Sequence, residues 1–145
     1  LMVNDVKTYI EKYSILNPEY ITIHYEIEEN LNDAIDLIKS KNCKVGLSIK
    51  PNTSINEILP YLDKIDLLLI MSVEPGKGGQ KFIESSLDKV KYLRERQNNY
   101  HYLISIDGGI NAETSKLVKQ AGVDVIIVGT YLANNLNKKT MDDLK

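Results

Sequence analysis

The chain has 145 residues, of which 43% are hydrophobic and 26% are charged, a composition typical of one soluble globular domain. Its formal net charge of −2 gives no electrostatic footprint for nucleic acid or an anionic membrane, and no apolar run approaches the roughly 20 residues that a membrane-spanning helix needs. We therefore expect neither nucleic acid nor a membrane as a partner. The single cysteine, Cys43, cannot form an internal disulfide, so we expect a reducing, cytoplasmic location.

Apolar runs alternate with amphipathic segments in the first third of the chain. Apolar residues at helical spacing over 6–13 predict a helix capped by Asn4, and the run 21–23 predicts a strand. Asn30 is expected to cap a second helix, and a strand over 45–49 follows it. The apolar face of that second helix consists of Leu31, Ala34, Ile35 and Ile38.

The middle of the chain continues this alternation. Ser54 and Glu57 form a capping-box pattern before a helix that Pro60 must shorten or kink. The run 67–71 is apolar without alternation, as expected of a strand buried on both faces of a parallel sheet. A longer helix is expected to begin near Ser85 or Ser86, with Leu87, Val90 and Leu93 directed inward.

The last third predicts two further strands, over 102–106 and 125–128. Between them Asn111 is expected to cap a helix that Gly122 ends in the left-handed conformation. A closing helix is expected over 140–145. The inward residues of the helix after Asn111 are predicted to be Leu117, Val118 and Ala121.

The spacing of the predicted strands indicates the fold class. Their starts near 21, 45, 67, 103 and 125 are separated by 24, 22, 36 and 22 residues, which suits successive βα units with right-handed crossovers. The sequence therefore predicts an α/β fold with a parallel sheet, and all of 1–145 is treated as one domain.

Unusual residues fall just past the predicted carboxyl ends of the strands: His24, the loop 74–80, Asp107-Gly108-Gly109 and Gly129-Thr130. In parallel α/β enzymes that edge carries the active site, and backbone amides of glycine loops bind phosphate there. Alone, Asp-Gly-Gly is more typical of a tight turn, but two further glycine loops at the same edge reverse that interpretation. We therefore expect chemistry on a small phosphorylated substrate.

Three segments, in this order and spacing, resemble ribulose-phosphate 3-epimerase, a family of TIM (β/α)8-barrel isomerases of the pentose phosphate pathway in carbohydrate metabolism. They are Ile70-Met-Ser-Val-Glu-Pro-Gly-Lys-Gly-Gly-Gln-Lys-Phe82, Ser105-Ile-Asp-Gly-Gly-Ile110 and Val128-Gly-Thr130. Leu1-Met-Val3 and Ile21-Thr-Ile-His-Tyr-Glu26 extend the resemblance over essentially the whole chain.

The resemblance implies interconversion of D-ribulose 5-phosphate and D-xylulose 5-phosphate, phosphorylated ketopentoses, by metal-assisted proton transfer at C3. Asp107 matches the aspartate that is both acid/base and ligand of a divalent cation (Zn, Fe, Mn or Co). The lid loop that closes on the substrate corresponds to Gly76, Lys77, Gly78 and Gly79. The phosphate-binding residues correspond to Gly108, Gly109, Gly129 and Thr130.

Two departures from the family pattern stand out. Lys77 replaces the usual phenylalanine, and its ammonium could reach the phosphate or point to water. The second catalytic aspartate and two histidine ligands of the family belong to strands that precede the position of Leu1. The chain therefore resembles about the last five βα units of a partial barrel, which we expect to be inactive alone and which is compatible with a homo-oligomer.

Alternative interpretations stay open at this point. One is an epimerase of a 6-phosphorylated ketohexose such as allulose 6-phosphate; another is a non-catalytic remnant that binds phosphate. His24 is more typical of a hydrogen-bonded structural histidine, and the cluster of Glu26, Glu28 and Glu29 is more typical of a solvated helix start than of a metal site. His101 follows Asn98-Asn99-Tyr100 at the amino-terminal end of a strand and is predicted to be a surface residue, and Cys43 is given no catalytic role.

Overall fold

The computed structural model describes residues 1–96 and 101–144 and contains one parallel sheet of five strands in the order β1-β2-β3-β4-β5. Each strand pairs with the next one along the chain, so every connection is a crossover in the same direction along the sheet. The strands are β1 (Tyr20–His24), β2 (Lys44–Ile49), β3 (Leu67–Met71), β4 (Leu103–Asp107) and β5 (Val125–Ile127). The predicted parallel α/β fold is confirmed.

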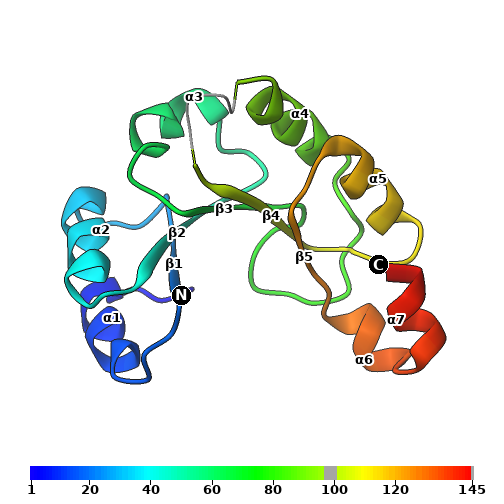
Figure 1. Cartoon of the computed structure of the whole chain (residues 1–145), viewed down its shortest axis with the longest axis horizontal. Coiled ribbons are helices and arrows are strands. Elements are labelled where there is room, and N and C mark those ends of the chain that lie inside the picture. Colours follow the sequence, from blue (N-terminus) through cyan, green and yellow to red (C-terminus); the bar gives the residue numbers. More distant parts are fainter. Residues whose placement is uncertain (97–100, 145) are drawn as a thin grey trace.

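The helices lie along the outer side of this curved sheet, which leaves its inner side open (Figure 1). Within the described ranges, no helix has the length and apolar character needed to cross a bilayer. The helices are α1 (Val6–Ser14), α2 (Leu31–Ser40), α3 (Ile55–Ile58), the 3-10 turn η1 (Leu59–Tyr61), α4 (Ser86–Arg96), α5 (Thr114–Ala121), α6 (Thr130–Asn134) and α7 (Lys138–Leu144).

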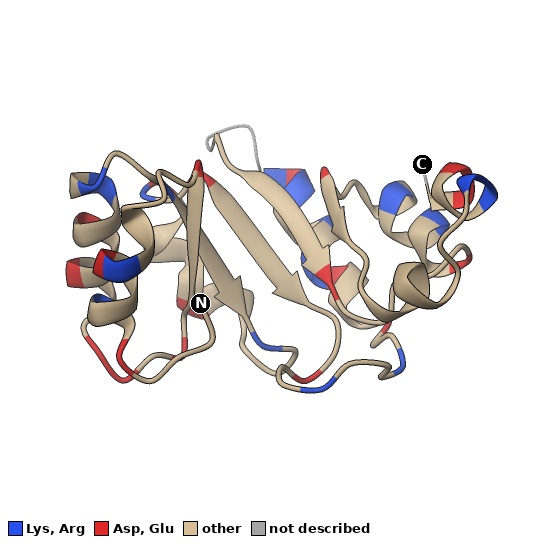
Figure 2. Cartoon of the chain, turned by 90° about the horizontal axis from the view of Figure 1, so that it is seen from below, with Lys and Arg blue, Asp and Glu red and all other residues tan. Residues whose placement is uncertain are grey.

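The main core lies between the sheet and the outer helices. Alternate strand residues such as Ile23, Leu47 and Ile104 have no exposed surface and pack in this layer. The residues between them point to the concave side, where Leu103 and Ile127 are 39% and 40% exposed. Charged residues are few along the strands and many in the helices and in the loops at the strand ends (Figure 2). One face of the sheet is thus packed, and the other is available to line a site.

Several local predictions are confirmed. Asn30 accepts hydrogen bonds from the amides of Asn32 and Asp33, and Ser54 and Glu57 form the expected capping box. The helix after Ser54 lasts four residues and tightens into η1 at Pro60, because proline cannot donate the next helical hydrogen bond.

Other boundaries differ from the predictions. Asn111 accepts hydrogen bonds from the amides of Glu113 and Thr114, but these cap a turn, and α5 begins at Thr114, two residues later than a helix capped by Asn111 would. Leu117, predicted to be inward, is 38% exposed because it lies on the outer side of α5. Gly122 ends this helix with φ +100°, as predicted.

The terminal elements also differ slightly from the predictions. The closing helix starts earlier than expected, at Lys138, and β5 stops at Ile127. The end of the closing helix at Lys145 lies outside the described residues.

Candidate active site

A cavity of about 560 Å³ lies at the carboxyl ends of β3, β4 and β5. Parallel strands bring these ends to one edge, so loops that are far apart in sequence meet there. The lining includes every residue predicted to bind substrate: Gly76, Lys77, Gly78, Gly79, Asp107, Gly108, Gly109, Gly129 and Thr130. The structure thus places these residues together, while their individual roles remain predictions.

Asp107 is the last residue of β4, opposite Met71 of β3. Its carboxylate is half-buried, and no hydrogen bond or ion pair holds it within the described part of the chain. Burial raises the pKa of the Asp107 carboxyl above its ordinary value. A carboxylate that is partly stripped of water, and that binds a proton more readily, suits proton transfer to and from a substrate.

Ser72 fixes the backbone on which Asp107 sits. Its amide and its hydroxyl both donate to the Asp107 carbonyl, at 2.8 Å and 2.9 Å, and the hydroxyl lies 2.7 Å from the Gly108 carbonyl. At Gly108, φ is +123° and a Cβ atom would lie 2.5 Å from Val73 Cγ2, so only glycine fits. Ser72 was not among the predicted site residues, because in the sequence it is only a polar residue after an apolar run.

The loop after β3 folds over the cavity and is closed by Gln80. Gln80 Nε2 donates to the carbonyls of Glu74 and Lys77, at 2.6 Å and 2.8 Å. Lys77 itself is exposed at the tip. A Cβ built on Gly78 would lie 3.1 Å from Thr130 Oγ1, so this loop reaches the loop after β5.

Gly129 stands at the start of α6 and faces open space, since nothing lies within 4 Å of the position that its Cβ would occupy. The lack of a side chain leaves its backbone accessible from the cavity that it lines with Thr130. Such an accessible backbone beside a hydroxyl donor is the arrangement that binds a phosphate group.

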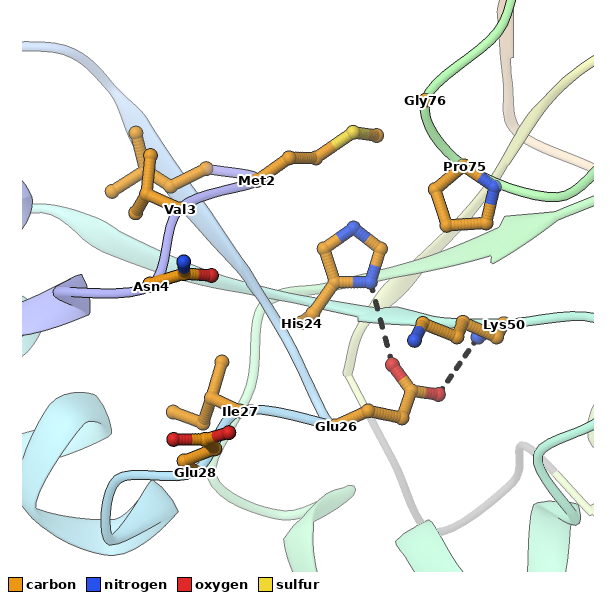
Figure 3. A pocket seen from close by; sticks show the side chains of 11 residues that line it. Met2, Val3, Asn4, His24, Glu26, Ile27, Glu28, Lys50, Pro75 and Gly76 are labelled. Carbon is orange, nitrogen blue, oxygen red and sulfur yellow. Dashed lines mark hydrogen bonds and ion pairs between the residues drawn. The ribbon is translucent and has the colours of Figure 1, made fainter.

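His24 lines a second cavity, of about 320 Å³, which adjoins the first at Met2, Pro75 and Gly76 (Figure 3). Its Nδ1 lies 3.4 Å from Glu26 Oε2, and neither atom has a hydrogen bond with good geometry in the described residues. A structural role for His24 stays a prediction.

The three glutamates that follow β1 differ in role. Glu26 was predicted to be solvated, but its side chain is only 20% exposed, because its carboxylate accepts hydrogen bonds from Thr53 Oγ1 and, at 2.9 Å, from the Lys50 amide. Glu28 is exposed, as expected. The solvated interpretation therefore fails for Glu26.

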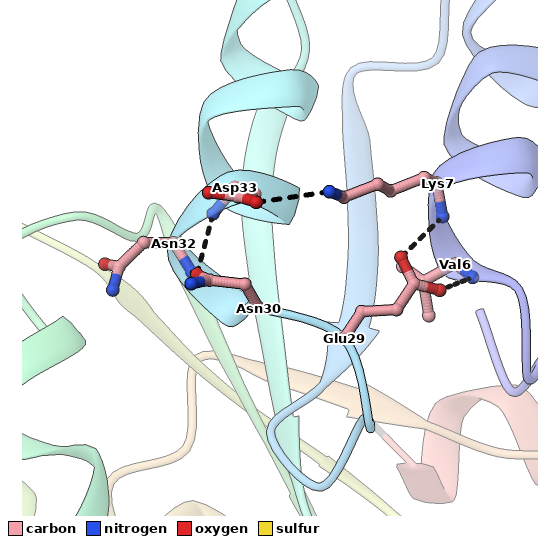
Figure 4. Close-up of polar contacts among 6 residues, drawn as sticks. All are labelled: Val6, Lys7, Glu29, Asn30, Asn32 and Asp33. Atoms are coloured by element: carbon pink, nitrogen blue, oxygen red, sulfur yellow. Dashed lines mark hydrogen bonds and ion pairs between the residues drawn. The ribbon is translucent and has the colours of Figure 1, made fainter.

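Glu29 was also predicted to be solvated, and it instead binds the start of α1. It accepts from the amides of Val6 and Lys7, at 2.6 Å and 3.3 Å (Figure 4). The predicted cap Asn4 is also wrong: Asp5 is the cap, since its side chain reaches the Thr8 amide. A negative charge at a helix start is favoured by the unpaired amides and the helix dipole.

The remaining candidates lie away from both cavities. His101 is exposed and Cys43 is buried at the opposite edge of the sheet, as predicted. No cluster of three or more potential metal-binding side chains occurs among residues 1–96 and 101–144. Asp107 is a single carboxylate, so the donor set that the described residues offer does not by itself fit a divalent metal centre.

A profile of the ribulose-phosphate 3 epimerase family matches residues 1–133. The chain belongs to this family. It is 40% identical over 139 residues to a ribulose-phosphate 3-epimerase of Buchnera aphidicola and 36% identical over 141 residues to one of Helicobacter pylori. The matches cover 94% and 96% of this chain but only 61% and 65% of those relatives. The chain therefore spans less than two thirds of their length.

Solved structures with a similar fold support the barrel interpretation of this epimerase-family chain. A tryptophan synthase α-subunit from Pyrococcus furiosus superposes with a TM-score of 0.71 at 12% identity, covering 96% of this chain and 59% of that one. A 3-hexulose-6-phosphate synthase gives a TM-score of 0.63 at 14% identity, covering 97% and 67%. At such identities the likeness concerns the fold alone, which is that of TIM-barrel proteins.

Proposed function

We propose that the chain supplies the phosphate-binding loops, the lid loop and one acid/base carboxylate of a ribulose-phosphate 3-epimerase. The observation that carries this proposal is that Asp107 opens onto the same cavity as the three glycine loops. Family membership adds the reaction, the interconversion of D-ribulose 5-phosphate and D-xylulose 5-phosphate. A ketohexose 6-phosphate would require the same chemistry, but nothing in the cavity favours the longer sugar.

In this proposal Asp107 transfers the C3 proton on one face of the sugar. The carboxylate takes the proton, the C3–H bonding electrons move toward the C2 carbonyl, and an enediolate forms. Return of a proton to the opposite face of C3 gives the epimer and needs a second acid. The raised pKa of Asp107, caused by burial, makes its carboxylate a better base toward carbon than an exposed aspartate.

The loops bind the other end of the substrate. Gly129 and Thr130 are proposed to contact the phosphate, with Gly108 and Gly109 on the β4 side of the cavity. The loop of Gly76, Lys77, Gly78 and Gly79 is proposed to cover it. Asp107 is proposed as one ligand of a divalent cation only in a protein that provides further ligands, because one carboxylate holds such an ion weakly.

The remaining proposals concern the setting of the protein. A cytoplasmic location fits a metabolic isomerase with one unpaired cysteine. A homo-oligomer is supported by large exposed apolar residues that line neither cavity, Ile15, Leu16 and Leu136.

The 145-residue chain on its own is expected to bind the substrate but not to epimerise it. It offers Asp107 on one face of C3, and the described part of the cavity presents no matching aspartate or metal-binding cluster opposite. The measurement is a coupled assay for xylulose 5-phosphate with the purified chain, beside amide shifts in an NMR titration with ribulose 5-phosphate. Epimerisation catalysed by the purified chain itself would contradict the proposal that the chain supplies only one of the two acid/base groups.

Replacing Gly129 with valine is expected to weaken binding of inorganic phosphate by at least about tenfold, the equivalent of losing one or two hydrogen bonds. Open space surrounds the Gly129 Cβ position, so the new side chain would project into the cavity without displacing protein atoms. NMR titration gives the affinity. Ala133→Val, on the exposed side of α6 and outside the cavity lining, is the matched control and should bind phosphate normally. Equal affinity of the Gly129 variant would remove this loop from the phosphate site.

A further inference from the structure

His24 lies at the carboxyl end of β1, on the same edge of the sheet as Asp107. Its neighbour Ile23 packs into the outer core with no exposed surface, so the alternation of a strand turns the imidazole to the concave side. The side chain is only 11% exposed and borders the second cavity together with Pro75 and Gly76 of the lid loop. A buried imidazole at this edge is therefore next to the substrate cavity, away from the helices.

Glu26 contacts this imidazole at Nδ1. Its Oε1 accepts from the Lys50 amide and from Thr53 Oγ1, which leaves Oε2, also buried, facing His24 Nδ1 at 3.4 Å. Although burial alone raises the pKa of the Glu26 carboxyl, the contacts with His24, Lys50 and Thr53 lower it to about 2. The carboxylate is thus ionised and its position is fixed.

The loop that binds Glu26 is fixed in turn by Lys89 of α4. Lys89 Nζ donates to the carbonyls of Lys50, Pro51 and Thr53, at 3.1 Å, 2.7 Å and 2.6 Å. Because one ammonium donates all three hydrogen bonds, it holds the carbonyls of the 50–53 loop together. His24 therefore stands at the end of a chain of contacts that begins on an outer helix.

The arrangement determines which imidazole nitrogen can meet a ligand. An ionised carboxylate oxygen beside Nδ1 requires a proton on Nδ1, because two lone pairs would repel each other. Nε2 is then an acceptor when the ring is neutral and a donor when it is charged. A sugar hydroxyl donates and accepts and therefore matches Nε2 in both states, whereas a phosphate oxygen matches only the charged ring.

We propose that His24 is a substrate-contacting residue whose Nε2 hydrogen-bonds a hydroxyl of the sugar, and that Glu26 is the positioning residue that sets its tautomer. The contact lies on the β1 side of the joined cavities, across from the phosphate loop at Gly129. This inference rests on the proposed function for the identity of the ligand, a sugar phosphate. It goes beyond the structural interpretation of His24, in which the contact of Nδ1 with Glu26 is the whole role of the ring, because the ring also borders the cavity.

The test uses the 145-residue chain labelled with ¹⁵N in the imidazole rings. The chain has two histidines, so the exposed His101→Gln variant assigns the His24 resonances and serves as the control. The free protein should show the tautomer with Nδ1 protonated. Glu26→Gln should remove this preference; an unchanged tautomer would overturn the role of Glu26.

Ligand titrations then distinguish sugar from phosphate. D-ribulose 5-phosphate should shift the Gly129 amide and His24 Nε2, and inorganic phosphate should shift the Gly129 amide alone. His24→Gln should weaken ribulose 5-phosphate about tenfold, the effect of one hydrogen bond, and leave phosphate affinity unchanged.

The outcomes separate this inference from the proposed function. A Gly129 shift with ribulose 5-phosphate and an unmoved His24 would overturn the inference alone, and so would an equal response of His24 to inorganic phosphate. A His24 shift without one at Gly129 would support the sugar contact and overturn the phosphate loop. If ribulose 5-phosphate shifted neither the Gly129 amide nor His24 Nε2, both proposals would be overturned.

Discussion

Replacing Asp107 with asparagine is expected to lower epimerase turnover by about 10²- to 10⁴-fold, the range found when a positioned acid/base is removed. Asparagine keeps the shape of the side chain but neither takes up nor returns the C3 proton. The fold should survive, because no hydrogen bond or ion pair of this carboxylate contributes to it in the described residues. The variant therefore separates chemistry from structure.

Measuring this effect requires a protein that contains both the base and the acid that the reaction at C3 needs. A chimera in which the amino-terminal part of the Helicobacter pylori relative precedes Leu1 meets this need, since that relative is 36% identical over 141 residues. The rate of xylulose 5-phosphate formation is compared between the chimera and its Asp107→Asn form. Asp36→Asn, an exposed aspartate on α2, is the matched control and should retain full turnover. Turnover by the Asp107 variant within a factor of ten of the parent chimera would remove Asp107 from the reaction.

The fold could be predicted because its determinants are local in the sequence. The run 67–71 is apolar throughout, as a strand in the middle of a parallel sheet must be, and it forms β3 over the same residues. Asn30 and Ser54 cap the helices that directly follow them, so the signal and its effect lie within three residues. At the start of α1 the prediction was wrong because Asn4 and Asp5 are adjacent residues of similar capping ability, and the further contact from Glu29 comes from 23 residues away.

The site could be predicted in part for the same reason. Glycine is informative in a sequence because it permits left-handed backbone and close approach, which is why Gly108 and Gly129 were found. Ser72 is a common polar residue whose partners lie 35 and 36 residues away, and Gln80 is a common polar residue that bonds carbonyls of its own loop, so nothing in the sequence distinguishes either one. Glu26 was misjudged because its burial depends on Thr53, 27 residues away in the sequence. Residues that hold a site in place are therefore harder to predict than the residues that line it.

The second large effect concerns the stability of the fold and the carboxylate of Glu26. Replacing Glu26 with glutamine is expected to lower the free energy of unfolding at pH 7 by about 2 kcal/mol, after discounting the pKa shift for partial solvent screening. Glutamine keeps the size of the side chain, but it lacks the charge that Lys50 N–H, Thr53 O–H and His24 face. An amide in this position accepts weaker hydrogen bonds than a carboxylate.

The sign of the pH dependence follows from the direction of the shift. The pKa of Glu26 is about 2 in the folded chain, against 4.5 for an ordinary glutamate, so the folded state binds this proton less readily than the unfolded state. The stabilisation is fully present above about pH 4.5 and is lost as the pH falls toward about 2. Urea unfolding of the chain and its Glu26→Gln variant at several pH values from 7 to 3 measures the difference. The gap between the two proteins should stay constant from pH 7 to about pH 5 and narrow below that.

Glu28→Gln provides the control for this experiment, because Glu28 is an exposed glutamate two residues away with the same change of charge. Its free energy of unfolding should stay within about 0.5 kcal/mol of the parent chain at every pH, as for an ordinary surface substitution. If the Glu26 variant instead lost the same stability at pH 3 as at pH 7, the loss would come from packing. The carboxylate would then not be the ionised group that orients His24, and Glu26 would not set the tautomer of that imidazole.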